Sequence, residues 1–156
     1  MRKFIMILTS LALLGGCDNA QNDEQLTVTN LTIVKGGYEG KTSAENGRHL
    51  KKYVSDKVQW IEAAGFPLAG TYVGYEAIEK QVFGRLGEYW QDYRFDVEGY
   101  VADGNKVVAY GTYSGVYRAT NKAFSARVVH VWKLDNGKIT HFEQFVDSVP
   151  VINAMK

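Results

Sequence analysis

The fold is decided by residues 92–147, which read DYRFDVEGYVADGNKVVAYGTYSGVYRATNKAFSARVVHVWKLDNGKITHFEQFVD. Apolar and polar residues alternate along this stretch, and a period of two is typical of half-buried β-strands. Clusters of Gly, Asn, Asp and Thr interrupt the alternation. Because each interruption is short enough for a tight turn, the stretch predicts an antiparallel meander of four strands, over residues 92–101, 106–117, 123–134 and 138–147.

Helical signals precede the meander. The clearest helix is predicted over residues 75–90, where apolar side chains recur at four-residue steps and form one face. This apolar stripe consists of Ile78, Val82, Leu86 and Trp90. Thr29 or Asn30 can cap a first helix that runs toward Tyr38, and Asn46 can cap a second, short helix.

The order of these elements predicts the fold class. A short strand is expected over residues 58–62, between the second helix and the long one, and Pro150 can open a last turn of helix. Helices and antiparallel strands segregated along the chain in this way are typical of α+β folds. We therefore expect a curved antiparallel sheet with the helices packed on its concave face.

The amino terminus has the pattern of an export signal. A basic start is followed by the apolar residues 4–14, and this run is too short for a membrane-spanning helix, which needs about 20 residues. The run ends in Leu14-Gly15-Gly16-Cys17, which resembles the bacterial lipobox. That resemblance implies that residues 1–16 are a cleaved lipoprotein signal peptide and that Cys17 is acylated, so that lipid holds the protein at a membrane.

The segment after the signal is polar and acidic. We expect residues 17–28 to be the acylated cysteine and a flexible tether, and residues 29–156 to form one domain. Asp18 directly follows Cys17, and an aspartate at this place resembles the inner-membrane retention signal of enterobacterial lipoproteins. The sequence thus predicts an exported lipoprotein on the periplasmic side, anchored in the inner membrane.

Charge and cysteine content exclude several classes of function. The 18 Lys and Arg residues balance the 17 Asp and Glu residues, so there is no electrostatic case for a nucleic-acid partner. Cys17 is the only cysteine, which excludes a disulfide within the chain and a catalytic thiol in the domain. The three histidines lack the spacing of a zinc site, and no nucleotide-binding fingerprint occurs. We expect no metal and no cofactor.

Four segments resemble a known family. Residues 69–78, 108–115, 130–139 and 142–147 are similar to the SnoaL-like branch of the nuclear transport factor 2 superfamily, and the resemblance extends over almost the whole domain. It implies a cone-shaped, cystatin-like α+β barrel with a deep apolar pocket, dimeric through the sheet. Ketosteroid isomerases, polyketide cyclases, limonene epoxide hydrolase and non-catalytic binding or scaffold proteins share this fold, so the fold alone implies no single chemistry.

The turn at residues 135–137 decides which side chains of the last two strands share the pocket face. A three-residue loop with a glycine bulge would place Leu134 opposite Lys138 and group the inward side chains Val128, His130, Trp132, Thr140, Phe142, Gln144 and Val146. A two-residue turn would instead set His130 beside His141, Glu143 and Asp147. The resemblance favours the first register, because the family carries an acid or donor on the penultimate strand.

By the same resemblance, four residues are candidates for catalysis. His130 takes the place of the acid that stabilises the oxyanion in ketosteroid isomerases, Glu62 matches their general base, and Tyr38 matches their tyrosine donor. Gln144 stands where limonene epoxide hydrolase has a catalytic aspartate, which argues against epoxide hydrolysis. A carboxyl group in an apolar pocket has a raised pKa, so Glu62 suits proton abstraction next to a carbonyl.

The expected pocket has an apolar wall that suits a flat ligand. Its wall is expected to comprise Trp60, Phe83, Tyr113, Val128, Trp132, Phe142 and Val146. Three functions follow as hypotheses: binding of a small apolar or aromatic molecule, cofactor-independent isomerase or cyclase chemistry, and a non-catalytic dimerisation or docking domain.

Overall fold

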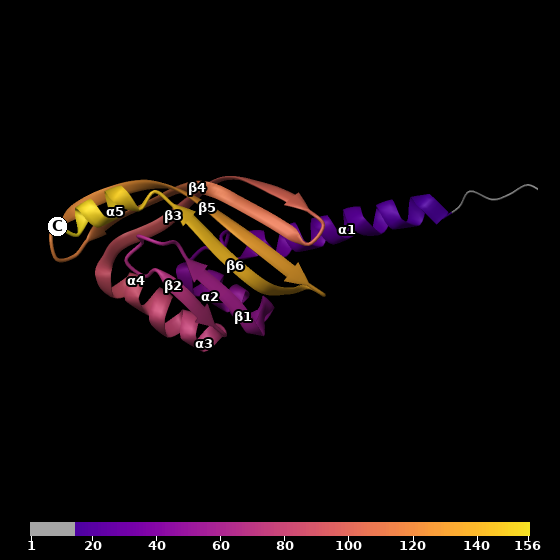
Figure 1. Ribbon diagram of the computed structural model, residues 1–156, viewed down its shortest axis with the longest axis horizontal. Helices are drawn as coiled ribbons and strands as arrows, with labels where there is room; N and C mark the ends of the chain where they lie inside the picture. The colour runs from indigo at the N-terminus through magenta and orange to yellow at the C-terminus, as the bar shows by residue number, and fades with distance from the viewer. Residues whose placement is uncertain (1–14) are drawn as a thin grey trace, which may run out of the picture.

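A curved six-stranded sheet forms the framework of the molecule (Figure 1). The computed structural model describes residues 15–156. Residues 1–14 of the predicted signal peptide lie outside the described residues. The strands follow the order β2-β1-β6-β5-β4-β3. Because the two edge strands do not pair with each other, the predicted α+β cone is an open one.

The predicted meander is confirmed. Its strands are β3 (Trp90–Asp103), β4 (Lys106–Tyr117), β5 (Lys122–Asp135) and β6 (Lys138–Val146). The predicted short strand is longer, β1 (Val54–Glu62), and lies parallel to β6. Its other neighbour, β2 (Gly70–Val73), was not predicted, because four mostly exposed residues carry no readable alternation. The sequence therefore predicted the centre of the sheet better than its edge.

The turn between β5 and β6 is shorter than predicted. Asp135 pairs with Lys138, so the turn has two residues and not three. Asn136 and Gly137 both have positive φ angles, 48° and 72°. Two consecutive positive values are the geometry of a type I′ turn, whose twist matches that of the flanking strands.

A β-bulge nevertheless restores the predicted face of β6. Leu134 pairs with Ile139, but the next pair is Lys133 with His141, so Thr140 is an extra residue without a partner. One inserted residue reverses the side-chain alternation beyond it. The inward grouping predicted for the rest of β6 is therefore correct, whereas the predicted opposition of residues 134 and 138 and the inward position of Thr140 are wrong.

Helices cover the concave side of the sheet and its ends (Figure 1). They are α1 (Gly15–Gly36), α2 (Ser43–Tyr53), α3 (Tyr75–Ile78), the π-helical turn η1 (Glu79–Phe83), α4 (Gly84–Tyr89) and α5 (Ser148–Ala154). Among residues 15–156, none of these helices is both long and apolar enough to cross a membrane.

Helix α1 replaces the predicted flexible tether. It begins at Gly15, and its first part projects beyond the sheet in Figure 1. Thr27 Oγ1 accepts a hydrogen bond of 2.8 Å from the Gly104 amide, and Asn30 Nδ2 donates one of 2.9 Å to the Gly104 carbonyl. Once these contacts hold one part of a helix against the β3–β4 turn, extending it residue by residue costs little. The prediction of a flexible segment over residues 18–28 was therefore wrong.

Helix α2 begins earlier than predicted. Thr42 is its cap, since the side-chain oxygen accepts a hydrogen bond from the Glu45 amide. Asn46, the predicted cap, lies within the helix and holds the preceding loop instead. Its Oδ1 accepts from the Gly40 amide at 2.7 Å, and its Nδ2 donates to the Tyr38 carbonyl at 3.3 Å. The loop that carries Tyr38 is thereby anchored to α2.

The predicted long helix is present, but its middle is a π turn. Ile78 and Val82 are fully buried, as the apolar stripe predicted. Their four-residue spacing exceeds the 3.6 residues of an α-helical turn, and the wider η1 turn keeps such a stripe in line. Trp90, the last member of the stripe, already belongs to β3.

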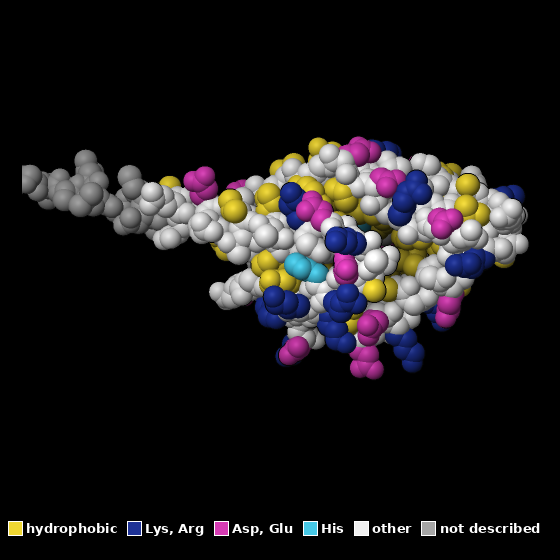
Figure 2. Space-filling view, turned by 180° about the vertical axis from the view of Figure 1, so that it is seen from behind, with side chains coloured by type: hydrophobic (Ala, Val, Ile, Leu, Met, Phe, Trp, Pro, Cys, Tyr) yellow, Lys and Arg dark blue, Asp and Glu magenta, His cyan; other side chains and the backbone are white. Residues whose placement is uncertain are grey.

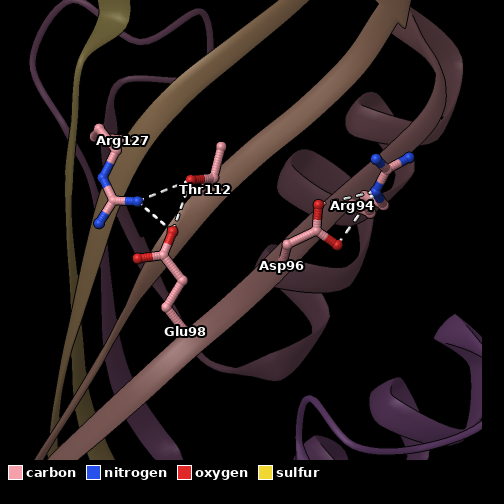
Figure 3. Close-up of polar contacts among 5 residues, drawn as sticks. All are labelled: Arg94, Asp96, Glu98, Thr112 and Arg127. Carbon is pink, nitrogen blue, oxygen red and sulfur yellow. Dashed lines mark hydrogen bonds and ion pairs between the residues drawn. The ribbon is translucent and has the colours of Figure 1, made fainter.

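The convex face of the sheet carries charged side chains in hydrogen-bonded pairs (Figure 3). Arg127 of β5 contacts both Glu98 and Thr112 on the neighbouring strands, and Arg94 pairs with Asp96 along β3. These side chains are about half exposed or more, and exposed ion pairs contribute at most about 1 kcal/mol each. The predicted dimer through this sheet stays a prediction.

Candidate functional site

A cavity of about 550 Å³ lies between the concave face of the sheet and the helices. Figure 2 shows the molecule hollowed on this side, with hydrophobic side chains inside the hollow and charged ones around it. Five of the predicted wall residues line the cavity: Trp60, Phe83, Tyr113, Trp132 and Phe142. A volume of this size is typical of sites for small organic molecules.

Two predicted wall residues do not line the cavity. Val128 is buried and is covered from inside, because Tyr113 pairs with Ala126 and its hydroxyl reaches past Val128 to His130. Val146 is half-buried and borders a shallow hollow beside β2 instead. Side-chain length, which alternation does not encode, decides which inward positions reach the ligand space.

His130 lies at the centre of a buried hydrogen-bonded cluster. Its Nδ1 is 2.7 Å from the Tyr38 hydroxyl, and its Nε2 is 2.6 Å from the Tyr113 hydroxyl. Each hydroxyl also accepts an N–H, Tyr38 from the indole of Trp132 at 2.9 Å and Tyr113 from the amide of Gln144 at 3.2 Å. The cluster thus connects the loop that follows α1 to strands β4, β5 and β6.

The protonation states of this cluster follow from its burial. Burial lowers the pKa of His130 to about 3, so the ring is neutral at physiological pH. Burial also raises the pKa of Tyr38 and of Tyr113 well above the ordinary tyrosine value, so both hydroxyls keep their protons.

Counting hydrogens shows that the cluster has one donor to spare. A neutral imidazole donates one hydrogen bond and accepts one. Whichever ring nitrogen of His130 carries the hydrogen, one tyrosine therefore donates to the ring and the other accepts from it. The accepting hydroxyl keeps its own hydrogen for another group. Since Tyr38 and Tyr113 both line the cavity, that O–H is available to an acceptor on a ligand.

Glu62 is the acid of the site. It is only 4% exposed and lines the same cavity as His130. Its Oε1 accepts a hydrogen bond of 2.6 Å from the Trp60 indole, whereas Oε2 has no partner among the described residues. Burial raises the pKa of Glu62 to about 7, and the neighbouring Trp60 and Gln144 side chains offset only part of that shift. The carboxyl group is therefore poised to exchange a proton near neutral pH.

The sheet places the acid and the donor cluster in one row. Ile61 pairs with Glu143, which brings Glu62 beside Gln144, and Gln144 pairs with His130. Two strand spacings separate Glu62 from His130, a backbone distance of about 10 Å. The acid and the donor cluster thus lie on the same inner face of the sheet, and Glu62, His130, Tyr38 and Tyr113 all line the cavity.

Gln144 supports the site without lining the cavity. It is buried, its amide N–H donates to Tyr113, and its carbonyl oxygen accepts from the Ala63 amide at 3.4 Å. Of the four predicted catalytic residues, Glu62, His130 and Tyr38 thus share the cavity, and Gln144 orients one of their partners.

Sequence reasoning missed several residues of the site. Tyr113 was expected as wall only, yet its hydroxyl is a member of the cluster. Trp90, Tyr93, Asp92 and Arg118 also line the cavity and were not predicted to do so. The long helix's stripe, which ended at Trp90, and the alternation that puts Tyr93 on the apolar side of its strand were the signals for two of them. Asp92 and Arg118 carried no such signal. Among residues 15–156, no group of His, Cys, Asp and Glu side chains is arranged to hold a metal ion.

Comparison with known proteins places this geometry in a family. The model of the SnoaL-like domain matches residues 38–142. The chain belongs to the SnoaL-like domain family. The match extends from Tyr38 to Phe142, so the matched region of this SnoaL-like domain contains Glu62 and His130 with both tyrosines that bind it, while Gln144 lies just beyond the region.

Solved structures agree with this assignment. A nuclear transport factor 2-like protein from Burkholderia thailandensis is 41% identical, with a TM-score of 0.77, and the alignment covers 81% of this chain and 97% of that one. A candidate SnoaL-like polyketide cyclase from Shewanella denitrificans is 16% identical, with a TM-score of 0.66 and coverages of 81% and 96%. No functionally curated protein is significantly similar to the chain.

A further structure shares the fold alone. It is a protein with a ketosteroid isomerase-like fold from Catenulispora acidiphila, in complex with trimethylamine. This protein is 14% identical, with a TM-score of 0.63, and the alignment covers 80% of the SnoaL-like domain's chain and 90% of that chain.

Proposed function

We propose that this SnoaL-like domain binds a small apolar or aromatic carbonyl compound and moves a proton next to its carbonyl group, as an isomerase or cyclase without a cofactor. One observation carries the proposal: a buried carboxyl group with a free oxygen, on Glu62, faces the same apolar cavity as a spare O–H donor. A base and an oxyanion donor are the two groups that enolisation requires.

The chemistry follows from the two groups. The ionised Glu62 carboxylate takes a proton from the carbon beside the carbonyl. The electron pair of the broken C–H bond forms a carbon–carbon double bond, and the π pair of the carbonyl moves to its oxygen. The spare O–H of Tyr38 or Tyr113 donates to the enolate oxygen. In an isomerisation Glu62 returns the proton to another carbon. In a cyclisation the enolate carbon attacks a second carbonyl of the same molecule, a carbon–carbon bond forms, and the resulting alkoxide takes the proton back from Glu62.

Simple binding is the second candidate function. A binding protein has no need for a carboxyl group within its apolar cavity, because burying such a group is unfavourable. The position of Glu62 inside the cavity, and not at its rim, favours proton transfer. The docking-domain hypothesis is less well supported, because a cavity of about 550 Å³ is not a filled core.

A pH profile tests the proposal. With 5-androstene-3,17-dione as a β,γ-unsaturated ketone probe, we expect the wild-type domain to form the conjugated enone. Because the base form of Glu62 is required and its pKa is raised to about 7, kcat/KM should rise about tenfold per pH unit below pH 7 and level off above it. Solvent deuterium incorporation into the probe, followed by mass spectrometry, reports the proton abstraction directly.

Binding without proton transfer would contradict the proposed chemistry. If ketone probes bind, as judged by quenching of tryptophan fluorescence, but neither isomerise nor exchange deuterium, the domain is a binding protein. Tryptophan fluorescence suits this test because all three tryptophans of the chain, Trp60, Trp90 and Trp132, line the cavity.

We also propose that the domain is held at a membrane by lipid on Cys17, on the periplasmic side. The support is the sequence pattern around Cys17. Mass spectrometry of the amino-terminal peptide from a bacterial membrane fraction should find a chain that starts at an acylated Cys17. The variant Cys17→Ser should lack that species. A mature chain that starts at any other residue contradicts the anchor.

A further inference from the structure

A second group of polar atoms lies in the same cavity, away from His130. Trp90 lines the cavity and is 2% exposed, yet its indole N–H has no hydrogen-bond partner among the described residues. Unpaired buried donors are rare, and each needs an explanation such as a missing ligand. An indole N–H can only donate, so the group that would satisfy it is an acceptor.

Arg118 adds a positive charge to this part of the cavity. Trp90 pairs with Tyr117 at the start of β3, and the Arg118 amide donates to the Tyr89 carbonyl, so Arg118 lies next to Trp90 in the sheet. The Arg118 side chain is exposed at the cavity wall, and no carboxylate of residues 15–156 lies within salt-bridge distance of it.

The backbone at this point is irregular. The β3–β4 register shifts between Gln91 and Arg94, and Asp92 has a φ of 54°. A non-glycine residue in this left-handed region is uncommon and marks a local constraint. Asp92 also lines the cavity, and its carboxylate accepts a hydrogen bond of 3.4 Å from the side-chain amide of Gln91. The cavity wall therefore carries two donors at this end, the Trp90 indole and Arg118, and one carboxylate, that of Asp92, which already accepts a hydrogen bond.

We propose that Arg118 and the Trp90 indole bind an anionic substituent, such as a carboxylate, on an otherwise apolar ligand. The proposal rests on the proposed function and adds the class of substrate to it. Charge favours one orientation of the ligand. Arg118 is the only Lys or Arg among the described residues that line the cavity, and it offsets the charge of Asp92, whereas no such cation lies beside Glu62. The anionic end therefore occupies the Arg118 side, while the carbonyl lies between Glu62 and the His130 cluster. An amphipathic carbonyl acid, and not a neutral ketone, is then the preferred substrate class.

Two probes with the same ring system test this assignment. 8-Anilinonaphthalene-1-sulfonate carries a negative charge, whereas N-phenyl-1-naphthylamine has the same rings without the sulfonate. Both are titrated into the wild-type domain and into Arg118→Gln, Arg118→Lys and Arg94→Gln, with the quenching of tryptophan fluorescence as the measure of binding in the cavity. Arg94 is the matched control, since it lies on the convex face of the sheet (Figure 3).

The sulfonate should lose affinity about five- to tenfold in Arg118→Gln, the value of one partly exposed charged hydrogen bond, while the neutral probe changes less than twofold. Arg118→Lys should keep most of the affinity, Arg94→Gln should keep all of it, and added salt should weaken only the sulfonate. Equal effects of Arg118→Gln on both probes, or none, overturn this inference and leave the proposed function intact. Failure of both probes to quench the wild type overturns the inference and the proposed pocket together.

Discussion

Replacing Glu62 by glutamine should lower the rate of proton transfer from a bound ketone by about 10²- to 10⁴-fold, the usual contribution of a positioned general base. Glutamine has nearly the same shape and can still accept the indole hydrogen bond of Trp60, so the cavity should keep its ligand. The expected result is a fall in kcat with little change in probe affinity. Steady-state kinetics and fluorescence titration measure the two quantities separately.

The same variant should change how stability depends on pH. The folded-state pKa of Glu62 is raised to about 7, from an ordinary value near 4.5. Between these values the folded state holds a proton that the unfolded state has released, so the wild type loses stability as pH rises from about 4.5 to about 7. The loss is about 3 kcal/mol in total. Glu62→Gln does not titrate and should gain that amount relative to wild type between pH 4 and pH 8.

The control for this variant is Glu76→Gln, which removes an exposed carboxylate from the first turn of α3. It should leave both the rate and the pH dependence of the unfolding free energy, measured by urea denaturation, close to wild type. If Glu62→Gln keeps the wild-type rate, the base is another group. If its stability advantage is the same at pH 4 and pH 8, Glu62 is not the buried acid described above.

Replacing His130 by leucine should destabilise the domain by about 2–5 kcal/mol at neutral pH and weaken ketone binding. The substitution removes the ring that both Tyr38 and Tyr113 bind in a buried site. The hydroxyl that donates to the ring loses its acceptor and the other loses one of its two donors, and each lost bond costs about 1–3 kcal/mol. Packing loss is small, because leucine fills a similar volume. Urea denaturation of the variant measures the cost.

A double-mutant cycle with Tyr38→Phe separates the cluster from packing. If His130 and Tyr38 act as a pair, the double variant should be less destabilised than the sum of the single variants, by about 1 kcal/mol or more. Additive effects would mean that the two side chains contribute independently and that the cluster is not a unit.

The stability deficit of His130→Leu should also shrink in acid. The folded-state pKa of His130 is lowered to about 3 from an ordinary 6.5, so below pH 6.5 the unfolded state binds a proton that the folded state does not. The wild type therefore loses stability as pH falls toward 3, and leucine removes that loss. A deficit that stays constant from pH 7 to pH 4 contradicts a buried neutral histidine.

Much of the fold could be predicted from local patterns. Alternation and turn residues placed all four meander strands, and the apolar stripe that begins at Ile78 placed the long helix. Patterns failed where a contact distant in sequence decides the structure. Helix α1 continues upstream because Thr27 and Asn30 bind the β3–β4 turn at Gly104, and no local pattern around residue 20 reports that turn.

The site was predicted in part. Glu62 and His130, both candidates from the sequence, line one cavity, and their catalytic roles stay predictions. The predicted face of β6 was correct although the turn was not. Two changes cancelled: a two-residue turn shifted the register by one, and the bulge at Thr140 shifted it back. Such compensation cannot be read from the sequence, because a bulge leaves no fixed residue signature.

The sequence by itself determined the strands, the helices and the kinds of side chain available, because these depend on periodicity and on residues adjacent along the chain. Only the tertiary structure decided which polar atoms meet and which stay unpaired. Tyr38 reaches His130 across 92 positions, while Glu62 Oε2 and the Trp90 indole have no partner within residues 15–156. Burial and hydrogen bonding between distant segments set the pKa of Glu62 and His130, and through them the chemistry proposed for this SnoaL-like domain.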